Sequence, residues 1–160
     1  MGKVIIENLF GIVAVSNNLC IGRDGGLPFK MRSDLQWFKQ QTMGSNLIVG
    51  RKTFETLPPL IGRNVYVLSK SPNKGYDLAK MLRIVANTPN EKFYVAGGAE
   101  VYSVMDKFIS QWFVTMVDAD VDGDTFLDEF PKGKYRDVKS IEKNEHNEYN
   151  AKIMNVWRAK

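Results

Sequence analysis

The chain has 160 residues, of which 44% are hydrophobic and 25% charged, and its formal net charge is +4. This composition is that of a globular protein able to bury a core, so we expect one domain over residues 1–160. Scattered basic residues and short apolar runs argue against a nucleic-acid partner and against a membrane span. The lone Cys20 excludes an internal disulfide and a multi-cysteine metal site, and the first residues lack the long apolar region of a secretion signal. These features predict a cytoplasmic protein without a metal.

The first elements are a strand, a long loop and a helix. The run LFGIVAV at 9–15 is apolar and rich in β-formers, which is typical of a buried strand. Gly, Asn and Asp-Gly breakers at 17–26 then predict a loop, and a helix follows from 34 to about 42. Ser33 has the residue type of a helix N-cap, and Gln36 has the position that completes a capping box. The helix is therefore predicted to begin just after Ser33.

This helix carries a carboxylate beside apolar residues. Asp34 lies one turn from Phe38, and Leu35 lies three residues from Phe38. Because a buried unpaired charge is costly, a packed core does not require Asp34, whereas a pocket that binds or delivers a proton would use the raised pKa that burial gives. An acidic residue in a first helical turn is also favoured simply by the helix dipole. The helix alone leaves both interpretations open.

Two strand ends carry cations. The strand NLIVG at 46–50 is followed by a predicted helix whose first residues are Arg51, Lys52 and Thr53. Cations are unfavourable at a helix N-terminus unless an anion is bound there, so a phosphate site and a pair of solvated side chains are both consistent with the sequence. A third strand, NVYVLS at 64–69, ends beside Lys70 and offers further anion contacts.

A glycine pair joins a later strand to a helix. Gly97 and Gly98 follow the strand KFYVA at 92–96 and precede a helical pattern at 99–107. This arrangement lets a backbone approach a pyrophosphate, but it lacks the full G-x-G-x-x-G pattern and would equally serve a tight turn. Tyr102 on that helix belongs either to the same ligand site or to the core.

Between these segments the sequence predicts a short helix at 78–82 and a strand at 83–86. A strand at 111–117 has Thr115 inside an apolar run, and the acidic loop DADVDGDT at 118–125 lacks the EF-hand pattern, so we expect turns there and no metal.

Strands at 134–143 and 151–158 are predicted to form an antiparallel hairpin around HNEYN, with His146 on the surface. Strands alternating with helices and closed by this antiparallel pair predict an α/β sandwich with a mostly parallel sheet.

The chain resembles the dihydrofolate reductase family in separated segments that occur in the family's order. These segments are IGRDGGLPF with SDLQWFK, VGRKTFETL, PPLIGRNVYVLS, YVAGGAEVY and VTMVDADVDGDTFL. The resemblance implies a single-domain sandwich with helices on both faces of the sheet and a C-terminal antiparallel hairpin. It also implies hydride transfer from NADPH to C6 of 7,8-dihydrofolate with protonation at N5, which is tetrahydrofolate biosynthesis for one-carbon metabolism. A cytoplasmic monomer that binds dihydrofolate and antifolate inhibitors is the corresponding expectation.

The resemblance also assigns the substrate site. Asp34 would hydrogen-bond the amino-pyrimidine edge of the pterin and promote N5 protonation through water, and Thr115 would hold Asp34. Leu27 would close over the nicotinamide, and Phe29 stands where the family usually has the tryptophan that holds an active-site water. Arg63 would clamp the glutamate α-carboxylate with its planar fork. The remaining substrate contacts are assigned to Ile12, Val13, Ala14, Leu27, Leu35, Phe38, Leu57 and Leu60.

For the cofactor, the resemblance implies phosphate contacts from the cations at 51–53 and 69–70, which would favour NADPH over NADH. Gly97 and Gly98 would approach the pyrophosphate through a cis peptide, and Asp124 would hydrogen-bond backbone near Gly22 to stabilise the closed loop. The full expected cofactor set is Ala14, Ile21, Gly22, Gly50, Arg51, Lys52, Thr53, Leu68, Ser69, Lys70, Gly97, Gly98, Ala99, Glu100, Val101, Tyr102 and Thr125.

Some positions depart from the family. Phe29 removes the indole donor, Ala96 replaces a larger aliphatic residue, and Glu100 stands where some relatives have a basic residue. Two alternatives therefore stay open: a related NADPH-dependent reductase of another pterin or pyrimidine, and a binding protein that keeps the fold without turnover.

Overall fold

The computed structural model describes residues 4–71 and 73–158, so the first three and last two residues of the predicted domain lie outside the described part. Its backbone contacts divide the chain into two compact units. The first unit takes the N-terminal residues through Gly11 together with Thr42–Ser110, and the second takes Ile12–Gln41 and the chain from Gln111. The single-domain boundary stays a prediction.

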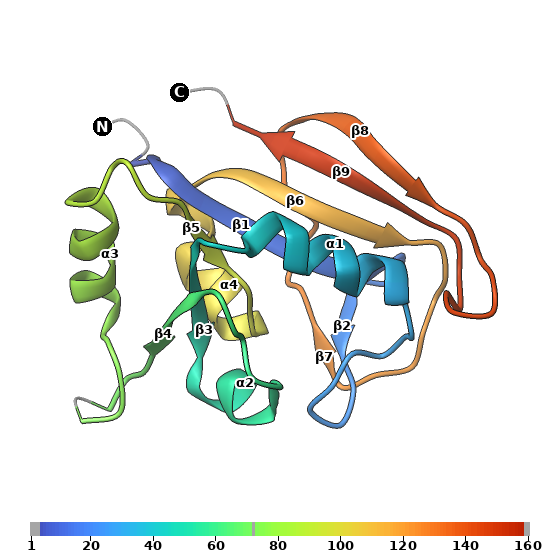
Figure 1. The fold of residues 1–160 in the computed structure, drawn as a ribbon, viewed down its shortest axis with the longest axis horizontal. Coiled ribbons are helices and arrows are strands. Elements are labelled where there is room, and N and C mark those ends of the chain that lie inside the picture. Colours follow the sequence, from blue (N-terminus) through green and yellow to red (C-terminus); the bar gives the residue numbers. More distant parts are fainter. Residues whose placement is uncertain (1–3, 72, 159–160) are drawn as a thin grey trace. The chain divides into compact units, whose positions relative to one another are not determined.

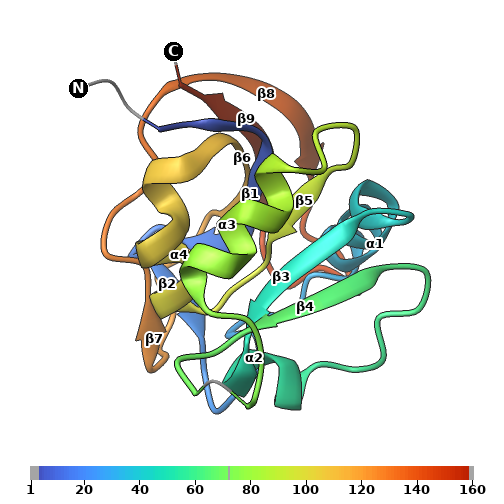
Figure 2. The ribbon, with the colours of Figure 1, turned by 90° about the vertical axis from the view of Figure 1, so that its left-hand side faces the viewer.

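The first unit contains a parallel sheet. Its strands are hydrogen-bonded in the order β4 (Asn64–Leu68), β3 (Asn46–Gly50), β5 (Phe93–Val95) and β1 (Ile6–Ser16), as Figure 2 shows. The pairs β3–β4, β3–β5 and β1–β5 are all parallel. The apolar centre of β3, Leu47 to Val49, is fully buried, which is the expected pattern for a parallel strand covered on both faces.

The described part of this unit has three α-helices, α2 (Arg51–Thr56), α3 (Leu78–Ala86) and α4 (Ala99–Met105), and a short 3-10 helix, η1 (Asp106–Phe108), follows α4. The predicted strand at 83–86 is wrong, because that segment is the second half of α3. Asp77 caps this helix by accepting a hydrogen bond from the Lys80 N–H at 2.8 Å. Met81 and Val85, one turn apart, are both fully buried. The helix is therefore stabilised by its cap and by an apolar stripe with helical rather than strand spacing.

The second unit is built on antiparallel strands and one helix. β6 (Ile109–Val117) pairs with β9 (Ala151–Trp157), which pairs with β8 (Lys134–Ile141), so the predicted C-terminal hairpin is confirmed (Figure 1). The helix is α1 (Arg32–Thr42). A buried apolar cluster fills this unit: Cys20, Phe29, Met31, Val117, Val121, Ile141, Ala151 and Ile153.

Two segments predicted as loops pair with each other in this unit. β2 (Cys20–Gly22) lies inside the predicted loop at 17–26, and β7 (Thr125–Phe126) closes the acidic loop at 118–125. Neither strand has a sequence signal of its own, because each is only two or three residues long. Among the described residues no group of acidic, histidine or cysteine side chains could hold a metal ion.

β1 runs through both units, and the hydrogen-bonded order of the strands is β4-β3-β5-β1-β6-β9-β8. The sheet is mixed, parallel at one end and antiparallel at the other, which confirms the α/β class predicted from the alternation of elements. In the described part of the chain, no helix is long and apolar enough to cross a membrane.

Candidate functional site

A buried carboxyl on α1 is bonded to a buried hydroxyl on β6. The Thr115 hydroxyl donates to Asp34 Oδ1 at 2.5 Å, and the two residues are 6% and 2% exposed. Burial raises the pKa of Asp34 above its ordinary value, and the Thr115 hydrogen bond offsets part of that rise. Thr115 interrupts an apolar strand because its hydroxyl is the partner of this carboxyl. A group of this kind can hold a proton at a pH where an exposed carboxyl has lost it.

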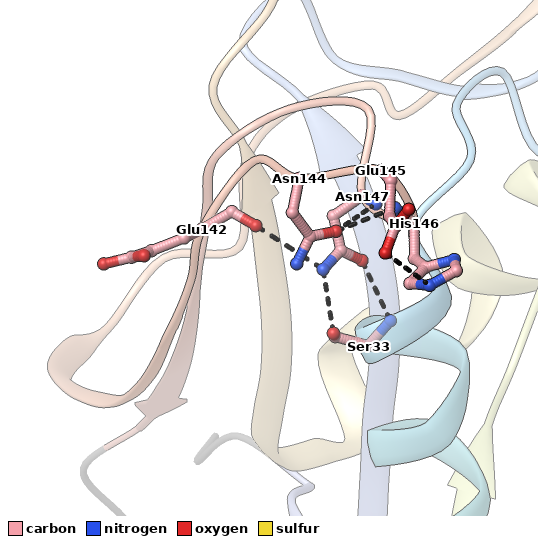
Figure 3. A network of polar contacts seen from close by, with 6 residues as sticks. All are labelled: Ser33, Glu142, Asn144, Glu145, His146 and Asn147. Atoms are coloured by element: carbon pink, nitrogen blue, oxygen red, sulfur yellow. Dashed lines mark hydrogen bonds and ion pairs between the residues drawn. The ribbon is translucent and has the colours of Figure 1, made fainter.

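The start of α1 differs from the prediction. The helix begins at Arg32, so Ser33 lies in its first turn and the predicted capping box is wrong. The Ser33 N–H donates to Asn147 Oδ1 at 3.0 Å, and the Ser33 hydroxyl accepts from Asn147 Nδ2 at 2.9 Å (Figure 3). Asn147 is 2% exposed and was not among the predicted residues; one asparagine in a polar turn gives no signal that it is buried. The predicted surface position of His146 is confirmed, with its side chain 52% exposed.

The loop before α1 is closed by hydrogen bonds from the acidic segment. The Asp24 N–H donates to Asp124 Oδ2 at 2.9 Å, and the Asp124 N–H donates to the Gly22 carbonyl at 3.0 Å. The Thr125 hydroxyl donates to Asp124 Oδ1 at 2.9 Å. The hydrogen bonds that the carboxylate accepts, from the Asp24 N–H above all and from the Thr125 hydroxyl, lower the pKa of Asp124. The carboxylate therefore stays charged and ties the loop to β7.

The loop ends in two apolar side chains with different surroundings. Leu27 is 46% exposed, whereas Phe29 is 4% exposed and packs with Cys20 and Met31 in the second unit's core. The other predicted substrate contacts of this unit also range from buried to exposed. Ile12 and Val13 are buried, Ala14 and Phe38 are half-buried, and Leu35 is 53% exposed. Ile21, a predicted cofactor contact, is half-buried in β2.

In the first unit, glycines bring the ends of two neighbouring strands together. The Gly50 N–H at the end of β3 donates to the Gly97 carbonyl at 2.8 Å, and the Gly97–Gly98 peptide bond is cis, as the resemblance implied. A Cβ on Gly98 would lie 2.9 Å from the Thr53 hydroxyl oxygen, and one on Gly50 would lie 3.0 Å from a Val101 methyl carbon. These positions therefore keep a bare backbone close to the starts of α2 and α4.

Gly97 itself has φ of +112°, a conformation that favours glycine. Its missing Cβ would lie 3.5 Å from the Tyr102 hydroxyl oxygen, and Tyr102 is 7% exposed. Tyr102 is thus a buried residue whose hydroxyl lies beside the glycine pair, and its contact with a ligand stays a prediction. Ala96 and Ala99, on either side of the pair, and Leu68 at the end of β4 are half-buried.

Two of the cations predicted to bind phosphate, Lys70 and Arg51, form ion pairs with carboxylates. Lys70 Nζ lies 2.6 Å from Glu100 Oε1, and Arg51 Nη1 lies 3.4 Å from Glu55 Oε1. The Lys70–Glu100 pair raises the pKa of Lys70 and lowers that of Glu100, and the charge of Lys52 lowers the Glu100 pKa further. Both members of the pair are exposed, so water and salt screen the attraction.

Arg63 is half-buried and only partly satisfied. Its Nη1 donates to the Thr42 hydroxyl at 3.3 Å, whereas its buried Nε has no hydrogen-bond partner among the described residues. An unsatisfied guanidinium donor is costly unless a ligand accepts from it, and a carboxylate matches the fork. The neighbouring predicted contacts Leu57 and Leu60 are 37% exposed and half-buried, respectively.

The residues present fit a dinucleotide and a carboxylate-bearing substrate. The bare backbone at Gly50 and Gly97–Gly98 leaves space that a Cβ would fill, and cations lie on the same unit, which suits the phosphates of a dinucleotide. The buried Arg63 Nε, an N–H donor without an acceptor among the described residues, suits a carboxylate of the substrate.

Comparison with known proteins gives one consistent result. A sequence model of the family described as dihydrofolate reductase matches residues 8–158. The dihydrofolate reductase of Buchnera aphidicola (subspecies Acyrthosiphon pisum) is 34% identical over 152 residues, covering 89% of this chain and 94% of that protein. That of Bacillus subtilis is 30% identical over 151 residues, covering 89% and 90%. A solved dihydrofolate reductase from Enterococcus faecalis, complexed with NADP(H) and RAB-propyl, has a TM-score of 0.82 and 25% identity, covering 98% of this chain and 99% of that one.

Proposed function

Because this chain belongs to the dihydrofolate reductase family, we propose that it reduces 7,8-dihydrofolate to 5,6,7,8-tetrahydrofolate with NADPH. The hydride is transferred to C6 and a proton is added at N5. The observation that carries the proposal is the buried Asp34–Thr115 pair, since a carboxyl with a raised pKa in an apolar setting suits protonation chemistry better than core packing.

Asp34 binds the amino-pyrimidine edge of the pterin, and the Thr115 hydroxyl holds its carboxyl in one orientation. A carboxylate is an acceptor for two donors, and an amino-pyrimidine edge offers two. The proton reaches N5 through water, and the raised pKa of Asp34 keeps that proton available nearer to neutral pH than an exposed carboxyl would.

Arg63 binds the glutamate tail of the substrate. The orphaned Nε supports this role because a carboxylate would satisfy it together with a second donor of the same fork. Ile12, Leu35, Phe38, Leu57 and Leu60 supply apolar surface for the pterin and benzoyl rings.

When bound, NADPH supplies the hydride. The backbone at Gly97–Gly98 approaches its pyrophosphate, and Arg51, Lys52 and Lys70 give the site its preference for a phosphorylated ribose. Leu27 closes over the nicotinamide and excludes water, while Asp124 stabilises the closed loop through the Asp24 N–H.

The proposal includes three further statements: the two units fold as one domain over residues 1–160, the protein acts as a cytoplasmic monomer, and antifolates bind in the dihydrofolate site. The absence of a Lys/Arg block supports a small-molecule partner rather than a nucleic acid.

The experiment is to follow NADPH absorbance on mixing the protein with NADPH and dihydrofolate, and to repeat it with NADH. We expect a fast decrease that prefers NADPH and that Asp34→Asn largely abolishes. NADPH binding without reduction of any pterin would instead support a binding protein. Reduction of another pterin or pyrimidine, but not of dihydrofolate, would support the related reductase.

A further inference from the structure

The tip of the β8–β9 hairpin is attached to the beginning of α1 by side-chain and backbone hydrogen bonds. Asn147 accepts from the Ser33 N–H at 3.0 Å and donates to the Ser33 hydroxyl at 2.9 Å. The Arg32 N–H donates to the His146 carbonyl at 3.2 Å. Figure 3 shows that Asn147 points from the hairpin onto Ser33. Two of the first backbone donors of α1 are therefore satisfied by residues more than a hundred positions away.

The segment before the helix is attached to the same tip. The Glu148 N–H donates to the Lys30 carbonyl at 2.8 Å, and the Lys30 N–H donates to the Glu148 carboxylate at 3.2 Å. Met31 and Asn147 form an antiparallel bridge. The chain thus enters α1 along the hairpin tip rather than through a free loop.

These contacts replace a local cap. The first N–H groups of a helix have no partner within the helix, and a side-chain oxygen just before it usually accepts from one of them. The residue before α1 is Met31, whose side chain lies in the apolar core and offers no oxygen. Asn147 supplies that oxygen from the hairpin.

Asp34 follows Ser33 directly, and its carboxyl must reach Thr115 on β6. We propose that Asn147 is a positioning residue for Asp34: by capping α1 from the hairpin tip, it fixes the first helical turn where the Asp34 carboxyl meets Thr115. The effect on turnover rests on the proposed function, whereas the effect on Asp34 itself does not.

The hairpin tip is ordered by its own hydrogen bonds, so it can act as a fixed support. Asn144 Oδ1 accepts from the N–H groups of His146 and Asn147 at 2.8 and 2.9 Å, and the Asn144 N–H donates to the Asn147 carbonyl at 3.0 Å. Asn147 Nδ2 also contacts the Glu142 carbonyl at 3.5 Å. The hairpin tip and the segment that enters α1 carry the charged or titratable residues Lys30, Arg32, Glu142, Lys143, Glu145, His146 and Glu148. The pKa of Asp34 is set by burial, which raises it, and by the Thr115 hydrogen bond, which lowers it, and not by these charges.

The test is a site-specific titration of the Asp34 carboxyl by carbon NMR in the ligand-free protein. In Asn147→Ala the first turn loosens and Asp34 gains water, so its pKa falls toward the ordinary value, because burial is the larger cause of the rise. We expect kcat/KM for dihydrofolate at neutral pH to fall about tenfold, since small displacements of a reacting group are costly.

Asn150→Ala is the matched control. Asn150 Oδ1 accepts from the Lys143 N–H at 2.7 Å, so the same substitution removes one hydrogen bond from the same hairpin without touching α1. It should destabilise the fold while leaving the Asp34 pKa and turnover unchanged. His146→Gln, titrated alongside, separates the ionisation of the imidazole from that of Asp34.

Asn147→Asp keeps an oxygen for the Ser33 N–H and places a negative charge near Asp34, so the Asp34 pKa should stay at or above its native value. Equal Asp34 pKa values and equal turnover in Asn147→Ala and Asn150→Ala would overturn the proposal. If Asn147→Ala does not fold, two other variants decide the proposal. Ser33→Ala removes the hydroxyl that Asn147 Nδ2 contacts and should lower the Asp34 pKa in part, whereas Asn147→Asp should not lower it. Equal shifts in the two variants reject the proposal. Full turnover in Asp34→Asn would reject the proposed role of Asp34, and no reduction of dihydrofolate by the native protein would reject the proposed function; in both cases the titrations would still test the positioning.

Discussion

In the second unit the predicted catalytic pair is buried and hydrogen-bonded, whereas in the first unit the predicted phosphate contacts are bare backbone and cations in solvent-accessible ion pairs. Asp34 and Thr115 are nearly inaccessible, while Lys70 and Glu100 have side chains that are 91% and 70% exposed. Buried pairs are sensitive to geometry and desolvation, and exposed pairs are screened by water and salt. The second unit should therefore govern the chemical step, and the first unit the choice of cofactor.

The largest expected effect is that of Asp34→Asn. It should lower kcat/KM at neutral pH by about 10²- to 10³-fold, because the group that promotes N5 protonation is lost while the Thr115 contact is kept. Steady-state kinetics over a range of pH values measure this loss. A near-normal rate would reject the proposed role.

The same variant should be more stable than the native protein at neutral pH. The folded-state pKa of Asp34 lies above its unfolded value, so the stability contributed by the protonated carboxyl is complete below the ordinary pKa and is lost as pH rises through the raised one. Denaturant unfolding should therefore show a difference in free energy that shrinks on acidification. A constant difference across pH would contradict burial as the cause.

Arg63→Gln should raise KM for dihydrofolate about ten- to a hundredfold with little change in KM for NADPH. Arg63→Lys tests the planar fork, because it keeps the charge and loses the two-donor geometry. If a substrate analogue without the glutamate tail is affected as strongly as dihydrofolate, Arg63 does not bind the tail.

Gly97→Ala should weaken NADPH binding about tenfold, because the new methyl group lies against Tyr102 and is strained at a positive φ, which displaces the backbone proposed to meet the pyrophosphate. Gly44→Ala is the matched control, since Gly44 has φ of +78° and a Cβ there would meet nothing within 4 Å. Gly44→Ala should lose about 1 kcal/mol of stability and Gly97→Ala at least as much, because a side chain is strained at both positive φ values. Isothermal titration measures the affinity of each variant for NADPH. Equal affinities in Gly97→Ala and Gly44→Ala would show that Gly97 serves only the turn.

The smallest effect is expected for Glu100→Gln. Removing the carboxylate frees Lys70 for the ribose phosphate, so KM for NADPH should fall about two- to threefold while KM for NADH does not change. High salt should erase the difference. Glu129→Gln, which breaks the exposed pair with Lys132, controls for the change in net charge.

Local patterns in the sequence predicted much of the fold. The strands within 9–15, 46–50 and 64–69 are predictable because short β-branched apolar runs bounded by turn residues are typical of buried strands. The segment 83–86 has the same composition, yet it is helical because Asp77 caps a helix whose Met81 and Val85 are buried. The strands β2 and β7 were not predicted, because each is too short to show a pattern in the sequence and they pair with each other across a long sequence separation.

By itself the sequence determined the α/β class, the glycine pair, the cations and the presence of an acidic residue at the start of α1. It could not determine what that residue does, because the helix dipole explains a surface aspartate equally well. Only the tertiary structure brought Asp34 to Thr115, 81 residues away, and Ser33 to Asn147, 114 residues away. The physical reason is that burial and hydrogen-bond partners, which set the pKa and orientation of a side chain, are properties of packed elements and not of neighbours along the chain.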